Sequence, residues 1–154
     1  MRLVREIVTH PRVWPWVSDD YSSPREEWRP AEHPGIWYVA VRDDSMPFGD
    51  CQPAELLGLV TFIPQNGACW EFHACLLPNA GTRRAHAAIL GSIRWIWERT
   101  ECRRVVTNVP AFNRQAMRCA RAIGLESIGV NRVSYMKDGK LHDQVLFGLS
   151  PEEK

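Results

Sequence analysis

The stretch Leu76–Ile89, which reads LLPNAGTRRAHAAI, decides the fold because the hydrophobic pattern changes within it. Before Pro78 the chain reads as a buried strand, and after Gly81 the apolar residues recur with the period of a helix. A strand that leads through a short turn into a helix leaves backbone N–H groups and the positive end of the helix dipole unpaired. Arg83 and Arg84 add charge there, so the segment favours phosphate. A plain strand–turn–helix with solvated arginines gives the same pattern.

Upstream of this stretch the sequence predicts strands and loops. Two apolar runs flank Gln65-Asn66-Gly67, and an Asn-Gly between apolar runs is a hairpin signal. The segment Pro11–Gly35 is rich in proline, tryptophan and acids, which favours loops and short helical turns. The strands expected here are residues 2–8, Trp37–Arg42, Leu56–Pro64 and Cys69–Leu77.

Downstream, the pattern predicts helix, strand, helix and a final hairpin. Asn113 suits a helix N-cap and Gly124 the position just past that helix, while Asp138-Gly139 suits a hairpin turn. The expected elements are helices Thr82–Thr100 and Asn113–Ile123, with strands Arg104–Val109, Ser127–Met136 and Gln144–Leu149. The whole chain, 1–154, then forms one α/β domain: a mixed, mostly antiparallel central sheet of about six to seven strands flanked by helices.

Composition narrows the class of protein. A chain of 154 residues that is 45% hydrophobic suits one globular domain, and its net charge of +1 argues against a basic or acidic tail. We expect no membrane span, no secretory signal in MRLVREIVTH, and a cytoplasmic location. Five cysteines without a C-x-x-C pair argue against a zinc site or a disulfide scaffold. Residues 83–132 hold ten arginines against three acids, which leaves a polyanion partner open, although nucleic acid is the weaker hypothesis.

One further motif indicates a family. Asn113-x-x-Ala116, followed by seven residues and Gly124-Leu125, resembles the N-x-x-A-x-x-x-Y-x-x-x-G-F helix of the GNAT superfamily, the acyl-CoA-dependent N-acyltransferases. The expected order of elements from residue 2 to 149 is similar to that family's. The resemblance implies acetyl-CoA as cosubstrate and an amine as acceptor. A homodimer is compatible with it.

The resemblance also implies a set of residues that bind the cofactor. In the family, the strand before the turn splays from its neighbour and binds pantetheine through its backbone, and the turn reads R/Q-x-x-G-x-G/A. This chain departs from that turn: Gly81 stands for the Arg or Gln, Arg84 for the Gly and His86 for the small residue. Asn113 is either a helix cap or also a cofactor contact. The implied binding residues are Ala74, Cys75, Leu76, Leu77, Gly81, Thr82, Arg83, Arg84, Ala85, His86, Asn113 and Ala116.

Catalysis requires a group that removes the proton of an ammonium acceptor. Glu71 and His73 share one face of the strand before the turn, and the family often carries an acidic base near Glu71. His73 has the ordinary pKa better suited to a base at neutral pH. The family's tyrosine acid falls on Ala120, so Tyr135 is the replacement we consider. The alternative is that these side chains are ordinary polar or core residues.

Three functions remain open from the sequence. The first is acetyl transfer from acetyl-CoA to an amine, with N-terminal tryptophans and acids as the acceptor site. The second is a GNAT-fold module that has lost activity and serves in binding or assembly, favoured by the missing tyrosine and the altered turn. The third is a small nucleic-acid-binding domain. Cys75 and Cys119 are weak candidates for an acyl-relay nucleophile, because neither is visibly paired with a His or Asp.

Overall fold

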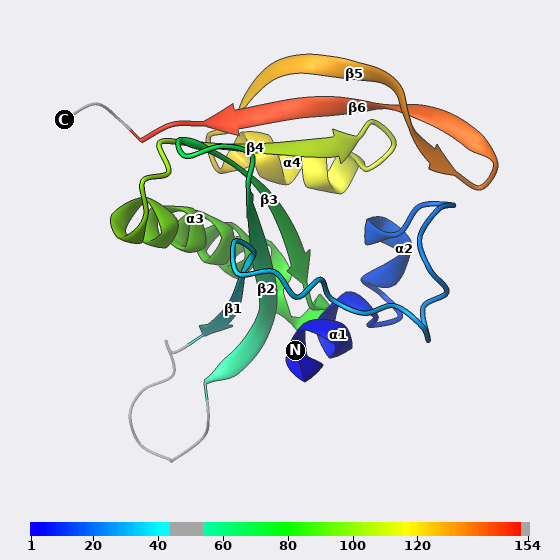
Figure 1. Cartoon of the computed structure of the whole chain (residues 1–154), viewed down its shortest axis with the longest axis horizontal. Helices are drawn as coiled ribbons and strands as arrows, with labels where there is room; N and C mark the ends of the chain where they lie inside the picture. Colours follow the sequence, from blue (N-terminus) through cyan, green and yellow to red (C-terminus); the bar gives the residue numbers. More distant parts are fainter. Residues whose placement is uncertain (44–53, 152–154) are drawn as a thin grey trace.

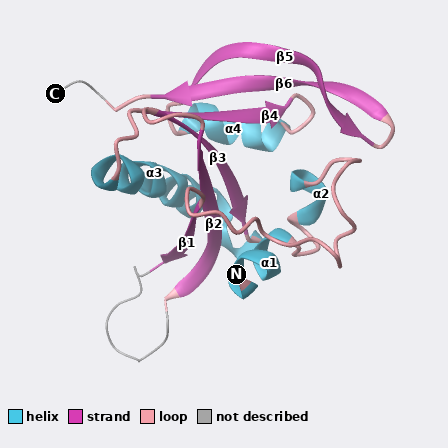
Figure 2. Cartoon of the chain, in the orientation of Figure 1, coloured by secondary structure: helices cyan, strands magenta, loops and turns pink. Residues whose placement is uncertain are grey.

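A central mixed sheet organises the molecule (Figure 1). The computed structural model describes residues 1–43 and 54–151, and within them the sheet has six strands in the order β1-β2-β3-β4-β6-β5. Among these strand pairs only β3–β4 is parallel. The strands are β1 (Trp37–Asp43), β2 (Glu55–Pro64), β3 (Cys69–Leu76), β4 (Arg104–Pro110), β5 (Glu126–Lys137) and β6 (Lys140–Leu149). The helices are α1 (Arg2–Val8), α2 (Trp14–Val17), the 3₁₀ turn η1 (Pro78–Ala80), α3 (Gly81–Arg99) and α4 (Arg114–Ala122). The predicted α/β class and strand number are confirmed (Figure 2).

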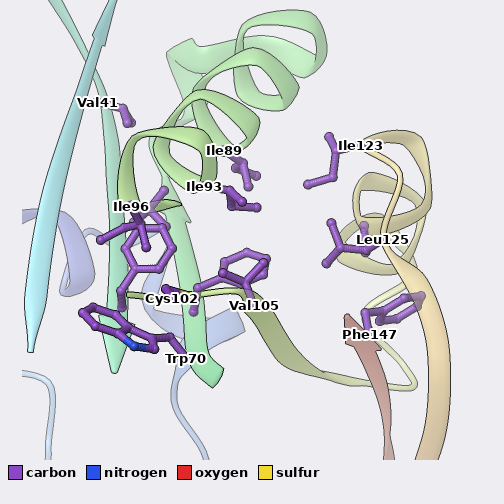
Figure 3. Packing of buried hydrophobic residues seen from close by; sticks show 14 of the residues in the cluster. Val41, Trp70, Ile89, Ile93, Ile96, Cys102, Val105, Ile123, Leu125 and Phe147 are labelled. Carbon is purple, nitrogen blue, oxygen red and sulfur yellow. The ribbon is translucent and has the colours of Figure 1, made fainter. Parts of the chain in front are cut away.

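The main hydrophobic core lies between the sheet and the helices α3 and α4. Ile89, Ile93 and Ile96 form one stripe of α3, and all three are buried against the sheet. Figure 3 shows Ile89 and Ile93 directed toward Ile123 and Leu125 at the end of α4, and Ile96 on the side nearer Trp70 of β3. The strand before the turn and the helix after it therefore have the positions that their hydrophobic periods predicted.

The strand predicted over residues 2–8 is wrong, because this segment is helix α1. Its apolar residues recur at helical spacing, so Val4, Ile7 and Val8 lie on one buried face of the helix. This face packs against Leu59 and Cys75 of the sheet. The β-branched residues in RLVREIV suggested a strand, but burial of this stripe outweighs their weak preference. Helix α1 consequently covers the sheet face opposite to α3.

The β2–β3 hairpin forms as predicted, and Gly58 of β2 allows the backbone of β3 to come close. Leu57 is the extra residue of a bulge, since Val41 pairs with Gly58 and the next residue of β1 pairs with Leu56. A Cβ on Gly58, whose φ is +148°, would lie 2.4 Å from the Cys75 carbonyl oxygen. Just beyond, the Leu77 N–H donates to the Leu57 carbonyl at 2.8 Å. The end of β3 is thus held against β2 up to the start of η1.

The last two strands form the predicted hairpin around Asp138-Gly139, whose φ angles of 51° and 70° suit a two-residue turn. Strand β5 is the outer strand, and its pairing with β6 shifts at two places, after Ser127 and after Asn131. Such irregularities blunt an edge against pairing with another chain. None of the described helices is long and apolar enough to cross a membrane.

Candidate active site

The parallel strands β3 and β4 separate soon after they meet. Their registered pairs end at Glu71↔Val106, yet β3 continues to Leu76 and β4 to Pro110. Figure 1 shows the two strands diverging toward the side where α1 and α2 lie. The backbones of β3 and β4 therefore diverge from a vertex at Glu71, as the predicted splay requires, and this divergence is called the opening.

Backbone groups of β3 face this opening at alternate residues. The Cys69 carbonyl accepts from the Gln65 N–H, and the Leu77 N–H donates to Leu57, so the odd-numbered residues direct their backbone toward β2. By the same alternation, Ala74 and Leu76 direct their N–H and C=O groups into the opening. Of the four residues expected to bind a ligand through their backbone, the structure therefore offers two, while Cys75 and Leu77 face β2.

The start of α3 lies directly beyond the open end of β3. Gly81 has φ 62° and ψ 169°, a conformation that is close to exclusive to glycine, and no described side chain caps the helix. The first N–H groups of a helix have no acceptor within it, so they suit an anion. Thr82 and Arg83 are exposed here, whereas Ala85 and His86 are half-buried.

Arg84 is turned away from the opening. Its guanidinium donates to Asp43 at 3.0 Å, to Glu55 at 2.6 Å and to the Ala80 carbonyl at 3.1 Å, and it also contacts the Asn79 carbonyl. These acids belong to β1 and β2, which lie on the side of β3 away from β4. The hydrogen bond from Asn79, followed by the contact with Arg84, lowers the pKa of Glu55. Arg84 therefore stabilises the turn and leaves the helix start open, and Arg83 is the exposed arginine that can still meet an anion there.

Helix α4 begins beside the other strand of the opening. The Asn113 side chain caps it, with Oδ1 accepting from the Ala116 N–H at 3.1 Å, which confirms the predicted N-cap. Gly124 has φ 89° just past the helix end. Ala120, at the position of the family's tyrosine, is buried in the core. Helix α4 therefore offers no tyrosine hydroxyl as a general acid.

Glu71 and His73 are brought together at the vertex, as their spacing predicted. Glu71 Oε1 lies 3.4 Å from His73 Nε2 and accepts from Asn108 Nδ2 at 3.3 Å, while Oε2 accepts from Gln65 Nε2 at 3.3 Å. Asn108 and Gln65 are site residues that the sequence did not predict. Asn108 lies two residues after Val106 on the same face of β4. Its contact with Glu71 depends on the register between β3 and β4, which cannot be predicted from neighbouring residues in the sequence.

The electrostatics of this pair favour a neutral imidazole. Burial of the ring among protein atoms lowers the pKa of His73 below its ordinary value, and the Glu71 carboxylate opposes this only in part. Both side chains still reach solvent, at 46% of the His73 surface and 23% of the Glu71 surface. A base that is unprotonated at neutral pH and accessible from outside is therefore present at the vertex.

The structure does not bring Tyr135 to this pair. Its hydroxyl donates to the Ser18 carbonyl at 2.8 Å, and its ring packs against Phe112. Burial, followed by the charges of Asp19 and Asp20, raises the pKa of Tyr135. These contacts tie β5 to the segment after α2, and the raised pKa makes the hydroxyl a weaker acid.

The thiols are poorly suited to nucleophilic catalysis. Burial raises the pKa of Cys75 to about 11 and also raises the pKa of Cys119. Because the thiolate is the nucleophile, a raised pKa leaves less of the reactive form of both residues near neutral pH. The four cysteines that the structure describes are free thiols, and Cys51 lies outside the described residues.

Two acids of the N-terminal region, Asp19 and Asp20, have structural partners. The Asp20 carboxylate accepts from the N–H groups of Asp138 and Gly139, and Asp19 accepts from the Tyr21 N–H. The two Asp20 bonds fasten the segment after α2 to the β5–β6 turn. Beside them lies an open groove of about 460 Å³, lined by Pro15, Trp16, Phe112, Lys137, Asp138, Lys140 and His142.

Comparison with known proteins gives one family and one fold. The family model of the acetyltransferase (GNAT) domain matches residues 1–126. A mutant form of the spermidine N-acetyltransferase SpeG from Vibrio cholerae is 18% identical with a TM-score of 0.65, over 76% of this chain and 66% of that chain. A ribosomal-protein-alanine N-acetyltransferase from Brucella melitensis is 15% identical with a TM-score of 0.60, over 76% of this chain and 70% of that chain. No curated protein sequence matches.

Proposed function

The chain belongs to the GNAT acetyltransferase family, and from this premise we propose that it transfers an acetyl group from acetyl-CoA to an amine of a small molecule or a protein. One arrangement carries the proposal: β3 and β4 part after Glu71↔Val106, and a helix that no described side chain caps begins just beyond the end of β3. A bound acetyl-CoA would supply the activated thioester. The chain's own residues would bind it, position the acceptor and remove the acceptor's proton.

The residues present fit such a cosubstrate. The backbones of Ala74 and Leu76 face the opening and suit the amide groups of a pantetheine arm. Gly81 and the N–H groups at the start of α3 suit the pyrophosphate, because the glycine keeps side-chain atoms away from the turn. Arg83 is exposed and adds charge at the start of α3. Asn113 uses its Oδ1 to cap α4, so its side-chain N–H₂ remains for a ligand.

The acceptor arrives as an ammonium ion and must lose a proton before its nitrogen attacks. We propose Glu71 and His73 as the base, acting directly or through a water, because they share one accessible face at the vertex. Tyr135 is not retained as the general acid, since its hydroxyl is bonded to Ser18. A thiol has an ordinary pKa of about 8.5, so a thiolate can leave without a dedicated acid.

Two measurements test this function. Calorimetric titration with acetyl-CoA should show binding at a single site, and a panel of small amines and peptides should show release of free thiol. Absence of heat and of thermal shift at millimolar acetyl-CoA would refute cosubstrate binding. Binding without any transfer would favour the second candidate, an inactive binding module, which the missing tyrosine at Ala120 supports. A cytoplasmic location remains part of the proposal and agrees with the free thiols.

A further inference from the structure

We propose that Asn108 is a positioning residue that fixes the Glu71 carboxylate at the vertex, in the orientation that receives the acceptor's proton. The proposal rests on the proposed function and assigns a role to a residue that the family motif does not include. It derives from one contact: Asn108 Nδ2 lies 3.3 Å from Glu71 Oε1, across the line where β3 and β4 part.

The location of Asn108 explains why this contact matters. Val106 is the last residue of β4 paired with β3, and Asn108 lies two residues beyond it on the same face. The backbone ladder that would hold β3 against β4 has ended there. The Asn108–Glu71 contact is therefore a side-chain bridge across the opening, placed where no backbone bond keeps the carboxylate in register with β4.

The chemistry of the two side chains fixes their orientation. An ionised carboxylate only accepts hydrogen bonds, so Asn108 directs its N–H₂ toward Glu71 and its Oδ1 away. Gln65 does the same at the other carboxylate oxygen, at 3.3 Å. Donors on both oxygens leave few rotamers for the Glu71 side chain. Oε1 also lies 3.4 Å from His73 Nε2, so the carboxylate that Asn108 contacts is the one beside the imidazole.

The residues paired with Glu71 in the sheet carry no charge. Its partner on β2 is Ile63 and its partner on β4 is Val106. The charged residue on the same face of β4, Arg104, pairs with the start of β3 and donates to the Ser150 hydroxyl at 3.1 Å. The Glu71 carboxylate is the charge that acts on His73. A new carboxylate at position 108 would therefore act directly on this pair.

Three variants test the proposal. Asn108→Leu keeps the size of the side chain and removes the donor. Asn108→Asp replaces the donor with a second carboxylate. Asn131→Asp is the matched control, because Asn131 is exposed on β5, three strands away from β3. Each variant is assayed for transfer between pH 5 and 9, for acetyl-CoA affinity by calorimetry, and for the titration of His73 by NMR.

We expect Asn108→Leu to lower kcat about 10-fold, the lower end for a lost hydrogen bond to a charged group, with acetyl-CoA affinity unchanged. Asn108→Asp should move the rising limb of the pH–rate profile upward by about one unit, because like charges disfavour ionisation. The same substitution should raise the NMR pKa of His73. Asn131→Asp should leave all three quantities at their wild-type values.

The inference is overturned if Asn108→Leu keeps the wild-type kcat, or if Asn108→Asp and Asn131→Asp give the same pH–rate profile. A purely structural role for Asn108 would lower stability and leave the position of the profile unchanged. Failure of the proposed function looks different: the wild-type protein itself then transfers no acetyl group to any amine. In that event the inference falls with the function.

Discussion

Removal of the base gives the sharpest test of the active site. Glu71→Gln removes the charge of the carboxylate but keeps its shape, and His73→Ala removes the imidazole 3.4 Å away. Loss of a general base costs on the order of 10²–10⁴ in rate. Because the vertex is open to solvent, water can substitute in part for the base. We therefore expect the lower half of that range for Glu71→Gln, with acetyl-CoA affinity nearly unchanged.

The pH dependence follows from the direction of the His73 shift. Its pKa is lowered, so the imidazole is neutral and able to accept a proton already below about pH 6.5. The wild-type rate should therefore rise with pH and level off below neutrality. In Glu71→Gln the carboxylate that opposes the shift is gone, so the pKa of His73 falls further and the remaining profile moves to lower pH.

The assay is thiol release from acetyl-CoA, measured from pH 5 to 9 on any accepted amine. Acetyl-CoA titration of each variant serves as the control that the binding site is intact. The reasoning is refuted if both variants keep the wild-type rate and profile, because the base must then lie elsewhere. A profile that levels off only above pH 8 would also contradict a His73 with a lowered pKa.

Three further tests separate binding, stability and catalysis. Arg83→Ala should weaken acetyl-CoA binding and reduce its salt dependence, whereas Arg84→Ala should chiefly lower the melting temperature, because Arg84 is bonded to Asp43 and Glu55. Tyr135→Phe should cost about 1 kcal/mol of unfolding free energy in urea titrations and leave the transfer rate unchanged. Gly58→Ala should cost about 3 kcal/mol or more and yield little folded protein by circular dichroism, because its Cβ would meet the Cys75 carbonyl.

Local signals in the sequence account for most of the fold. The β2–β3 hairpin, helix α3 and the N-cap at Asn113 each depend on residues within a few positions of one another, and all three are confirmed. Helix α1 was missed because seven residues contain few turns, and β-branched side chains obscured the helical spacing of Val4, Ile7 and Val8. Its helical state depends on burial against Leu59, which no local pattern reveals.

The site was only partly predictable for the same reason. Glu71 and His73 are two residues apart, so their shared face follows from strand geometry. Asn108 is 37 residues from Glu71, and Arg84 is 41 residues from Asp43. Both contacts depend on which strands are neighbours and in which register. From the sequence, Arg84 was predicted to bind phosphate. The strand order shows instead that its two carboxylate partners, Asp43 and Glu55, lie on the side of β3 away from β4.

The chain departs from the family pattern in its altered turn and in the missing tyrosine at Ala120, and the packing gives these two departures different consequences. A side chain at position 84 would block a phosphate only if it entered the opening, but two acids and the turn carbonyls hold Arg84 toward β1 and β2. Binding of acetyl-CoA is therefore compatible with the altered turn. The loss of the tyrosine is not compensated in the same way, because Ala120 is buried and Tyr135 is bonded to Ser18. Under the proposed function, catalysis would then depend on deprotonating the acceptor more than on protonating the thiolate, and that step is the one proposed for Glu71, His73 and the residue that orients them.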